Sequence, residues 1–259
     1  MESTYYKNPN FLIIADDLGL HQAVNEGIIF LLKNKYITGA SLMANGQAFD
    51  DAVGKIKDIP PESLIGIHLV LVEEKPIAGL KIYKNYYSFL ISYILGRVKI
   101  DDVEKEFRAQ IRKCLDAGVL PKFLNSHQHL HLLPGIMDVT IKVANEFGIK
   151  YIRLVNEPII FSFGKIFRIA QLLFLRFLSG LALRKIKKNG ISSNDIFVGF
   201  INAGNLKPED AALAGKLGKE NKDRIVELGC HPGFESEDLE AKYKNWGVYN
   251  WRRELEIFS

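Results

Sequence analysis

The chain has 259 residues, of which 47% are apolar and 25% charged, and its formal net charge is +4. This balance is typical of a globular protein with a sizeable core, and it excludes an intrinsically disordered chain. The length fits one α/β barrel, so we expect a single domain over residues 1–259 with its core in 10–258. The first residues show no apolar segment followed by a small-residue cleavage site, which favours a cytoplasmic protein.

Apolar runs of strand type alternate with segments of helical periodicity along the chain. Strands are expected at 11–15, 40–44, 65–71, just before the histidines at 127, and at 151–155, 196–200 and 224–229. Helices are expected at about 24–32, 48–57, 101–117, 135–148, within a basic amphipathic segment at 158–190, and from 208. Segment 73–99 is irregular and fits either a functional loop or an embedded helix. The alternation predicts an α/β fold, specifically a distorted TIM-like (β/α) barrel of about seven parallel strands, closed or nearly closed.

Several classes of protein are disfavoured by what the sequence lacks. No glycine-rich phosphate loop follows the first strand, which argues against a nucleotide-binding fold. The basic residues are not combined with stacking aromatics or a known motif, so we expect no nucleic-acid partner. Cys114 and Cys230 are isolated thiols, and we expect them to be buried and inert.

Three histidines occupy every second position at His127, His129 and His131, just before Pro134-Gly135. If the strand continues through them, their side chains face the same way. One interpretation is a polar turn whose histidines are hydrogen-bonded at the surface. Three imidazoles in register favour the other interpretation, a metal site.

Residues of the type that a hydrolytic metal site needs lie at the ends of several predicted strands. Asp16 and Asp17 follow the first strand, and His68 lies near the end of the third. Arg153 lies on the fifth strand and His231 follows the last. Two histidines and one carboxylate would leave positions open for water and substrate. One aspartate can bind the metal while its neighbour acts as base, His231 can protonate a leaving amine, and Arg153 either positions the base or forms an ordinary salt bridge.

Four motifs, in this order along the chain, resemble those of the YdjC-like carbohydrate deacetylases. They are Asp16-Asp17-Leu18-Gly19, Gly66-Ile67-His68-Leu69, the stretch from Asn125 to His131, and Glu227-Leu228-Gly229-Cys230-His231-Pro232-Gly233. The resemblance runs from about Phe11 to the C-terminus. It implies a distorted TIM-type barrel and divalent-metal-dependent removal of acetyl groups from N-acetylated sugars, such as chitooligosaccharides.

The resemblance also implies roles for single residues. Asp17, His68 and His127 would bind the metal, Asp16 would be the base and His231 the acid. Asn125, His129 and His131 are candidates for supporting the ligands or binding substrate. Asn125 stands where the family usually has Asp, so a neutral amide replaces a carboxylate that could orient a ligand histidine.

Several questions stay open at this level. Histidine and carboxylate ligands admit magnesium, zinc, manganese, nickel or cobalt, and we expect one divalent cation with Mg²⁺ favoured. Another metal-dependent barrel hydrolase, such as a phosphoesterase or amidohydrolase, would use the same residues. A catalytically silent binding protein that docks through 160–188 is a third reading, and a homodimer is left open.

The basic segment has a composition of its own. Residues 158–194 contain seven Lys and Arg and no Asp or Glu. On a helical wheel, one face carries Ile166, Phe167, Ala170, Leu173, Phe174, Phe177, Leu178 and Leu181, and the other Lys165, Arg168, Arg176 and Lys187. The helix either packs its apolar face on the sheet or lies in a membrane interface, whereas its interior charges disfavour a spanning helix.

The segment from Tyr151 to Pro158, with the helix after it, resembles the hopanoid-associated branch of the family. That branch is implicated in deacetylating a lipid-linked amino sugar. The expected partner is therefore an acetylated amino-sugar substrate, either an oligosaccharide or lipid-linked. Peripheral membrane contact through 160–188 is expected with the second.

Overall fold

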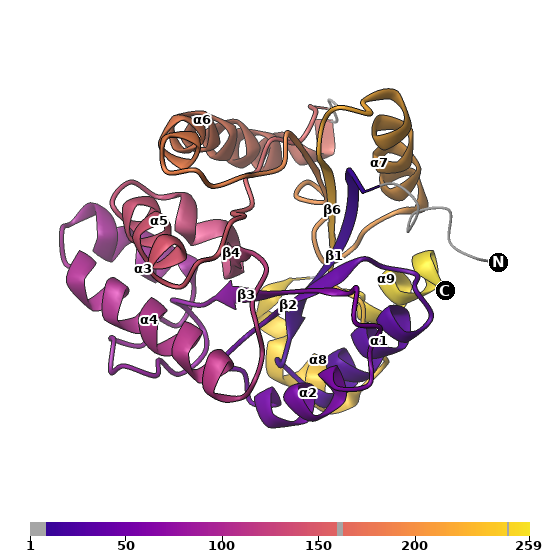
Figure 1. The fold of residues 1–259 in the computed structure, drawn as a ribbon, viewed down its shortest axis with the longest axis horizontal. Coiled ribbons are helices and arrows are strands. Elements are labelled where there is room, and N and C mark those ends of the chain that lie inside the picture. The colour runs from indigo at the N-terminus through magenta and orange to yellow at the C-terminus, as the bar shows by residue number, and fades with distance from the viewer. Residues whose placement is uncertain (1–8, 160–162, 248) are drawn as a thin grey trace.

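The computed structural model describes residues 9–159, 163–247 and 249–259. Within them, helices surround one six-stranded sheet (Figure 1). The strands are β1 (Phe11–Leu18), β2 (Gly39–Leu42), β3 (Leu64–Leu69), β4 (Leu124–Ser126), β5 (Ile196–Val198) and β6 (Val226–Cys230). The α-helices are α1 (Gln22–Lys33), α2 (Phe49–Ile56), α3 (Tyr86–Ile94), α4 (Ile100–Asp116), α5 (Ile136–Glu146), α6 (Ile166–Lys188), α7 (Pro208–Glu220), α8 (Glu237–Tyr243) and α9 (Trp251–Phe258). Short 3₁₀ helices are η2 (His127–Leu132), η3 (Phe163–Lys165) and η4 (Lys244–Trp246).

The sheet has the strand order β4-β3-β2-β1-β6-β5, and its strand pairs are parallel. β1 is a central strand, so that Ile14 pairs with Gly39 of β2 on one side and with Gly229 of β6 on the other. The strands are almost entirely buried, as expected for parallel strands covered by helices. The predicted α/β class and parallel sheet are therefore confirmed.

The predicted fifth strand, at 151–155, is wrong, and the six strands form an open half-barrel. Tyr151 and Ile152 make only isolated bridges, to Ser192 and Leu124. Beyond them, the Asn194 side chain bonds the backbone N–H and C=O of Leu154, both at 2.7 Å. The Ser179 hydroxyl does the same for Val155, at 3.0 and 3.1 Å. Side chains thus take the place of a neighbouring strand, and the ladder stops.

The strand predicted just before the histidines is confirmed as β4, but it does not continue through them, because the chain turns into η2 at His127. Gln128 and His129 have left-handed φ values of 56° and 54°. A strand cannot pass through this conformation, so the three imidazoles lose their period of two. Each therefore lies in different surroundings.

Helix α6 ends at Lys188, as predicted, but it begins at Ile166, later than predicted, and its apolar face is turned outward. Seven of the eight residues of the predicted apolar face are exposed, and only Leu178 is buried. The buried side consists of Ile169, Leu172, Leu178, Ser179, Ala182 and Ile186. The simple barrel helix with that face packed on the sheet is thereby excluded.

The predicted cationic face of α6 is wrong in part. Lys165, Arg168 and Arg176 are half-buried and hydrogen-bond to Asn202 Oδ1, the Phe200 carbonyl and the Glu157 carbonyl, respectively. Lys187 is exposed, as predicted.

The segment 73–99 contains an embedded helix, α3. Asn85 begins it with a capping box, in which the Asn85 side chain accepts from Ser88 N at 2.9 Å. Both cysteines are buried and unpaired, and burial raises the pKa of Cys114 to about 12. Neither thiol is therefore available as a nucleophile.

Candidate metal centre and active site

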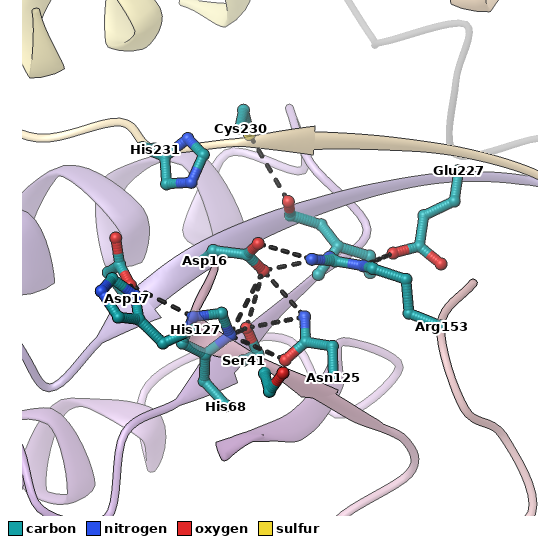
Figure 2. A network of polar contacts seen from close by, with 12 residues as sticks. Asp16, Asp17, Ser41, His68, Asn125, His127, Arg153, Glu227, Cys230 and His231 are labelled. Carbon is teal, nitrogen blue, oxygen red and sulfur yellow. Dashed lines mark hydrogen bonds and ion pairs between the residues drawn. The ribbon is translucent and has the colours of Figure 1, made fainter. Parts of the chain in front are cut away.

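The two consecutive aspartates of β1 reach one cluster because the strand is irregular there. In a regular strand, neighbouring side chains point to opposite faces of the sheet. The register between β1 and β2 shifts between Ala15 and Leu18, and Asp17 has a left-handed φ of 66°. Asp17 lies near Nε2 of His68 and Asp16 near Nδ1 (Figure 2). Backbone of this kind at a non-glycine residue is costly and is typical of functional sites.

Asp17, His68 and His127 form a buried cluster whose ligand atoms lie within 4.8 Å of one another. Asp17 Oδ1 is 3.3 Å from His68 Nε2 and 3.3 Å from His127 Nδ1. The three residues come from β1, β3 and the first residue of η2. The structure thus brings together the three residues predicted to bind a metal.

The chemistry of this donor set fits a divalent cation. Both carboxylate oxygens of Asp17 are buried and accept no hydrogen bond from the described residues. A buried polar atom without a partner is expensive, and a bound cation would satisfy it. Burial raises the pKa of Asp17, but His127 and His68 hold it well below its usual range. The carboxylate is therefore in the form that binds a cation.

A chain of hydrogen bonds fixes the tautomer of His68. The amide nitrogen of Asn125 donates to Asp16 Oδ1 at 2.9 Å, since a carboxylate can only accept. The amide oxygen of Asn125 then lies 2.8 Å from His68 Nδ1, which must carry the proton. Nε2 of His68 is left with a lone pair directed at the cluster, as a ligand requires.

Glu73 fixes the tautomer of His127, and it is not among the residues predicted from the sequence. Its Oε2 accepts from His127 Nε2 at 2.8 Å, which leaves Nδ1 to face Asp17. Glu73 has a left-handed φ of 73°, and its N–H donates to the Tyr83 carbonyl at 2.7 Å. The pair Glu73-Glu74 follows a buried apolar run just as Asp16-Asp17 does, so the same pattern could have identified it.

Asp16 is held by a buried ion network on the other side of His68. Arg153 is fully buried and donates from Nη2 to Asp16 Oδ1 at 3.0 Å and from Nε to Glu227. The Tyr151 hydroxyl donates to Glu227 Oε2 at 2.7 Å, and Ser41 donates to Asp16 Oδ1 at 2.8 Å. Burial raises the pKa of Asp16, but the charge and hydrogen bond of Arg153 and the charges of His68 and His231 together outweigh it and hold the pKa well below its usual range. Asp16 is therefore an oriented, ionised carboxylate.

His231 follows β6, the neighbour of β1 on the side away from β2, and lines the same cavity. Its Nδ1 lies 3.7 Å from Glu254 Oε2, and its backbone N–H donates to the same oxygen at 2.5 Å. Burial lowers the pKa of His231, but Glu254 and the charges of Asp17 and Asp16 together outweigh this effect and raise the pKa. His231 therefore tends to keep its proton, as a general acid must.

His129 and His131 separate into different environments. His131 accepts from the Ser126 hydroxyl at 2.6 Å and donates from Nε2 to the Arg153 carbonyl at 2.9 Å. Burial lowers its pKa to about 4, so it is a neutral brace between η2 and the segment that carries Arg153. His129 lines the cavity and packs against Phe197 and Phe200, with ring centroids 5.9 and 5.7 Å away.

A cavity of about 360 Å³ opens over the cluster. Asp16, His68, His127 and His231 lie in its wall. The rest of the wall includes the aromatic residues Tyr86, Tyr87, Trp246 and Tyr249, which the sequence analysis did not single out. The ring of Trp246 lies 4.8 Å from that of His127. The cavity therefore combines a polar floor with an aromatic wall.

The fold and the site together define a parallel α/β half-barrel protein with a candidate metal centre at the carboxyl ends of its strands. A family model described as YdjC-like protein matches residues 10–259. The chain belongs to the YdjC-like family, as its motifs predicted.

Relatives with curated names share this length. Proteins named carbohydrate deacetylase from Oceanobacillus iheyensis and Clostridium beijerinckii are 31% and 26% identical to this chain, over 95% and 94% of it. The alignments cover 93% and 87% of those proteins. A relative of the same name from Geobacillus stearothermophilus is 32% identical over 87% of this chain and 80% of its own.

A crystal structure from Enterococcus faecalis, of a protein named for cellobiose-phosphate cleavage, has the same fold. It superposes with a TM-score of 0.70 at 21% identity and covers 97% of this chain and 91% of its own.

Proposed function

We propose that the protein is a metal-dependent carbohydrate deacetylase, which hydrolyses the acetamide of an N-acetylated sugar to acetate and a free amine. The observation that carries the proposal is the buried Asp17 carboxylate, which faces His68 Nε2 and His127 Nδ1 and has no hydrogen-bond donor among the described residues. The names of the relatives, which align over most of the chain, support the substrate class.

The residues around the cluster divide the reaction between them. A divalent cation held by Asp17, His68 and His127 would polarise the acetamide carbonyl and lower the pKa of a water molecule. Asp16 accepts the proton of the attacking water. Three neutral or cationic donors, Ser41, Asn125 and Arg153, hold the Asp16 carboxylate in place for that transfer.

The departing nitrogen needs a proton, and His231 supplies it. His231 lies in the cavity wall opposite the ligand histidines, so the scissile amide can sit between it and Asp16. The amino group then leaves as a neutral amine and the acyl group as acetate. Arg153 contributes by orienting Asp16.

The cavity wall fits a sugar ring. Tyr86, Tyr87, Trp246 and Tyr249 present aromatic surface, against which the C–H faces of a pyranose can pack. His129 and Arg168 lie in the same wall and can hydrogen-bond its hydroxyl groups. The proposed substrate is therefore an N-acetylglucosamine-containing oligosaccharide or a lipid-linked amino sugar.

The proposal is tested by acetate release from N-acetylglucosamine oligomers, after chelation and re-addition of single metals. Mg²⁺ is the ion expected from the sequence, and the two imidazole ligands also suit Zn²⁺, so both are compared. We expect the metal-free enzyme to be inactive and His68→Ala to lose both bound metal and activity. His21→Asn is the matched control, because His21 caps α1 outside the cavity.

Two results would contradict the proposal. Full activity of chelated wild type, with no metal detected by mass spectrometry, would exclude a metal-dependent reaction. Release of phosphate from sugar phosphates, with no acetate from any acetylated sugar, would assign the site to a phosphoesterase instead.

A further inference from the structure

Two helices at the mouth of the cavity expose large apolar side chains to solvent. On α6 these are Ile166, Phe167, Leu173, Phe174, Phe177 and Leu181. On α3 and its C-cap they are Tyr87, Ile91, Ile94 and Leu95. Ile94 is 78% exposed and Phe177 62% exposed, which is unusual for such residues in a folded protein. We call these ten residues the docking face.

The two helices meet at the cavity. Tyr86 and Tyr87 of α3 and Arg168 of α6 line the cavity wall. The side-chain amide of Gln171 in α6 donates to the Tyr86 hydroxyl at 3.1 Å, which ties the N-terminal parts of both helices together. A surface that binds the docking face therefore lies beside the entrance to the proposed active site.

The segments that carry the docking face are strongly basic. Residues 75–100 contain five Lys and Arg, residues 158–194 contain seven, and neither segment contains Asp or Glu. All 30 acidic residues lie elsewhere, where they outnumber the other 22 basic ones. Lys81, Lys84 and Arg97 beside α3 are exposed, as are Arg184, Lys187 and Lys188 at the end of α6.

Helix α6 is long and apolar enough to cross a membrane by length and composition, but it is held in the fold. Ser179 bonds both backbone groups of Val155, and Leu172 and Ile186 are fully buried. Leaving the sheet would expose these residues and unpair Val155. Contact through the exposed side alone is compatible with all of these interactions.

We propose that the docking face binds the surface of a membrane that contains anionic lipids. Apolar side chains of this kind insert at the boundary between headgroups and acyl chains, and exposed cations at their flanks are attracted to anionic headgroups. The protein would thus be a cytoplasmic one held at the inner membrane face. This inference rests on the proposed function in one respect, which is that it places the deacetylation site over lipid-linked N-acetylated sugars.

A second copy of the chain is the other occupant to consider. Two docking faces placed together would bring like charges from both segments into proximity, which opposes association. A membrane with anionic lipids has the complementary sign. The charges therefore favour the membrane.

The proposal is tested by flotation of the full chain with vesicles of phosphatidylcholine and phosphatidylglycerol in equal parts. We expect wild type to float with these vesicles, to float less at high salt, and to bind pure phosphatidylcholine weakly. Replacing Arg184, Lys187 and Lys188 together with Gln should weaken binding about 10- to 100-fold. The double variant Ile94→Ser, Phe177→Ser should not float.

Matched controls use residues away from the docking face. Lys216, Lys219 and Lys222 are also exposed, and changing all three to Gln removes the same charge. Leu120 is 70% exposed before β4, at the opposite end of the strands from the cavity, and Leu120→Ser removes one exposed apolar side chain. Both controls should bind vesicles like wild type.

Three outcomes would overturn the proposal. The first is absence of wild-type binding to the anionic vesicles. The second is equal loss of binding in the charge variant and its control. The third is a lipid-free dimer that Ile94→Ser, Phe177→Ser dissociates in light scattering, which would assign the docking face to a second copy.

The docking proposal and the proposed function can be refuted independently of each other. Binding needs no metal and no turnover, so His68→Ala should float like wild type. A protein that floats but releases no acetate would refute the proposed function alone. One that deacetylates soluble oligosaccharides but never floats would refute the docking proposal alone.

Discussion

The side-chain amide of Asn125 joins the proposed base to a proposed metal ligand. It donates to Asp16 Oδ1 and accepts from His68 Nδ1, so each end of the amide has the polarity that its neighbour needs. A carboxylate at this position could still accept from His68. It could not donate to Asp16, and two carboxylates would then face each other in a buried site.

We expect two different results from two replacements of Asn125. Asn125→Leu removes both hydrogen bonds and should weaken metal binding about 10- to 100-fold, as measured by calorimetry, because the His68 tautomer is no longer fixed. Asn125→Asp should retain the metal but shift the acidic limb of the rate profile to higher pH, since one proton is retained between the two carboxylates. An unshifted profile with Asn125→Asp would show that the amide does not act on Asp16.

Glu73 is expected to matter although no motif contains it. Glu73→Ala removes the acceptor of His127 Nε2 and should lower metal affinity about 10- to 100-fold, whereas Glu73→Gln keeps an acceptor and should lose less. Glu74→Ala is the matched control, because Glu74 accepts from Tyr243 and not from a ligand histidine. Equal metal affinities of Glu73→Ala and Glu74→Ala would show that Glu73 does not support the metal ligands.

Strands and helices could be predicted from the sequence wherever burial and periodicity coincide. β1, β2, β3 and β6 are short apolar runs between turns, and the polar residues at their ends form the site. The turn at Gln128 and His129 carries no glycine to signal its left-handed backbone, so the sequence leaves a strand through the histidines open. The end of the ladder at Leu154 depends on Asn194, which is distant in sequence.

The outward apolar face of α6 shows a related limit. Helical periodicity identifies a face, but only the tertiary structure shows which side is buried. Here the face of α6 that contains Ser179 and Ala182 packs inward, because Ser179 hydrogen-bonds to the backbone of Val155. A buried Ser–backbone contact has no periodic signature in a sequence.

We expect Asn194 to stabilise the backbone at Leu154, where the strand ladder ends. Asn194→Leu leaves the buried N–H and C=O of Leu154 unpaired and should lower the free energy of unfolding by about 2–4 kcal/mol in urea titrations. Asn145→Leu, at an exposed position of α5, should change it by less than about 0.5 kcal/mol. Equal stability of the two variants would mean that water or another group satisfies Leu154.

Glu157 should make the stability of the folded protein depend on pH. Its side chain is buried, Oε2 accepts from Phe200 N at 2.6 Å, and burial raises its pKa to about 7. A carboxyl group whose pKa is higher in the folded than in the unfolded protein binds its proton more tightly when folded. Its contribution is therefore fully present below the unfolded pKa of about 4.5 and is lost as pH rises through about 7.

Glu157→Gln cannot ionise and keeps an oxygen acceptor, so it isolates this effect. Between pH 5 and 8, wild type should lose up to about 3 kcal/mol relative to Glu157→Gln in denaturant titrations. Glu220→Gln, at the exposed end of α7, should follow wild type. Parallel curves for wild type and Glu157→Gln would show that Glu157 is ionised at both pH values.

The central position of β1 has a consequence for the order in which the protein can assemble. β1 leaves the ribosome long before its neighbour β6, because the paired residues Phe11 and Val226 are far apart in the sequence. Contacts between such distant segments close the longest loops and form late in folding. During synthesis, the side of β1 that pairs with β6 must wait for that strand, and His231 follows it. A growing chain is therefore expected to complete its active site only after β6 has been synthesised.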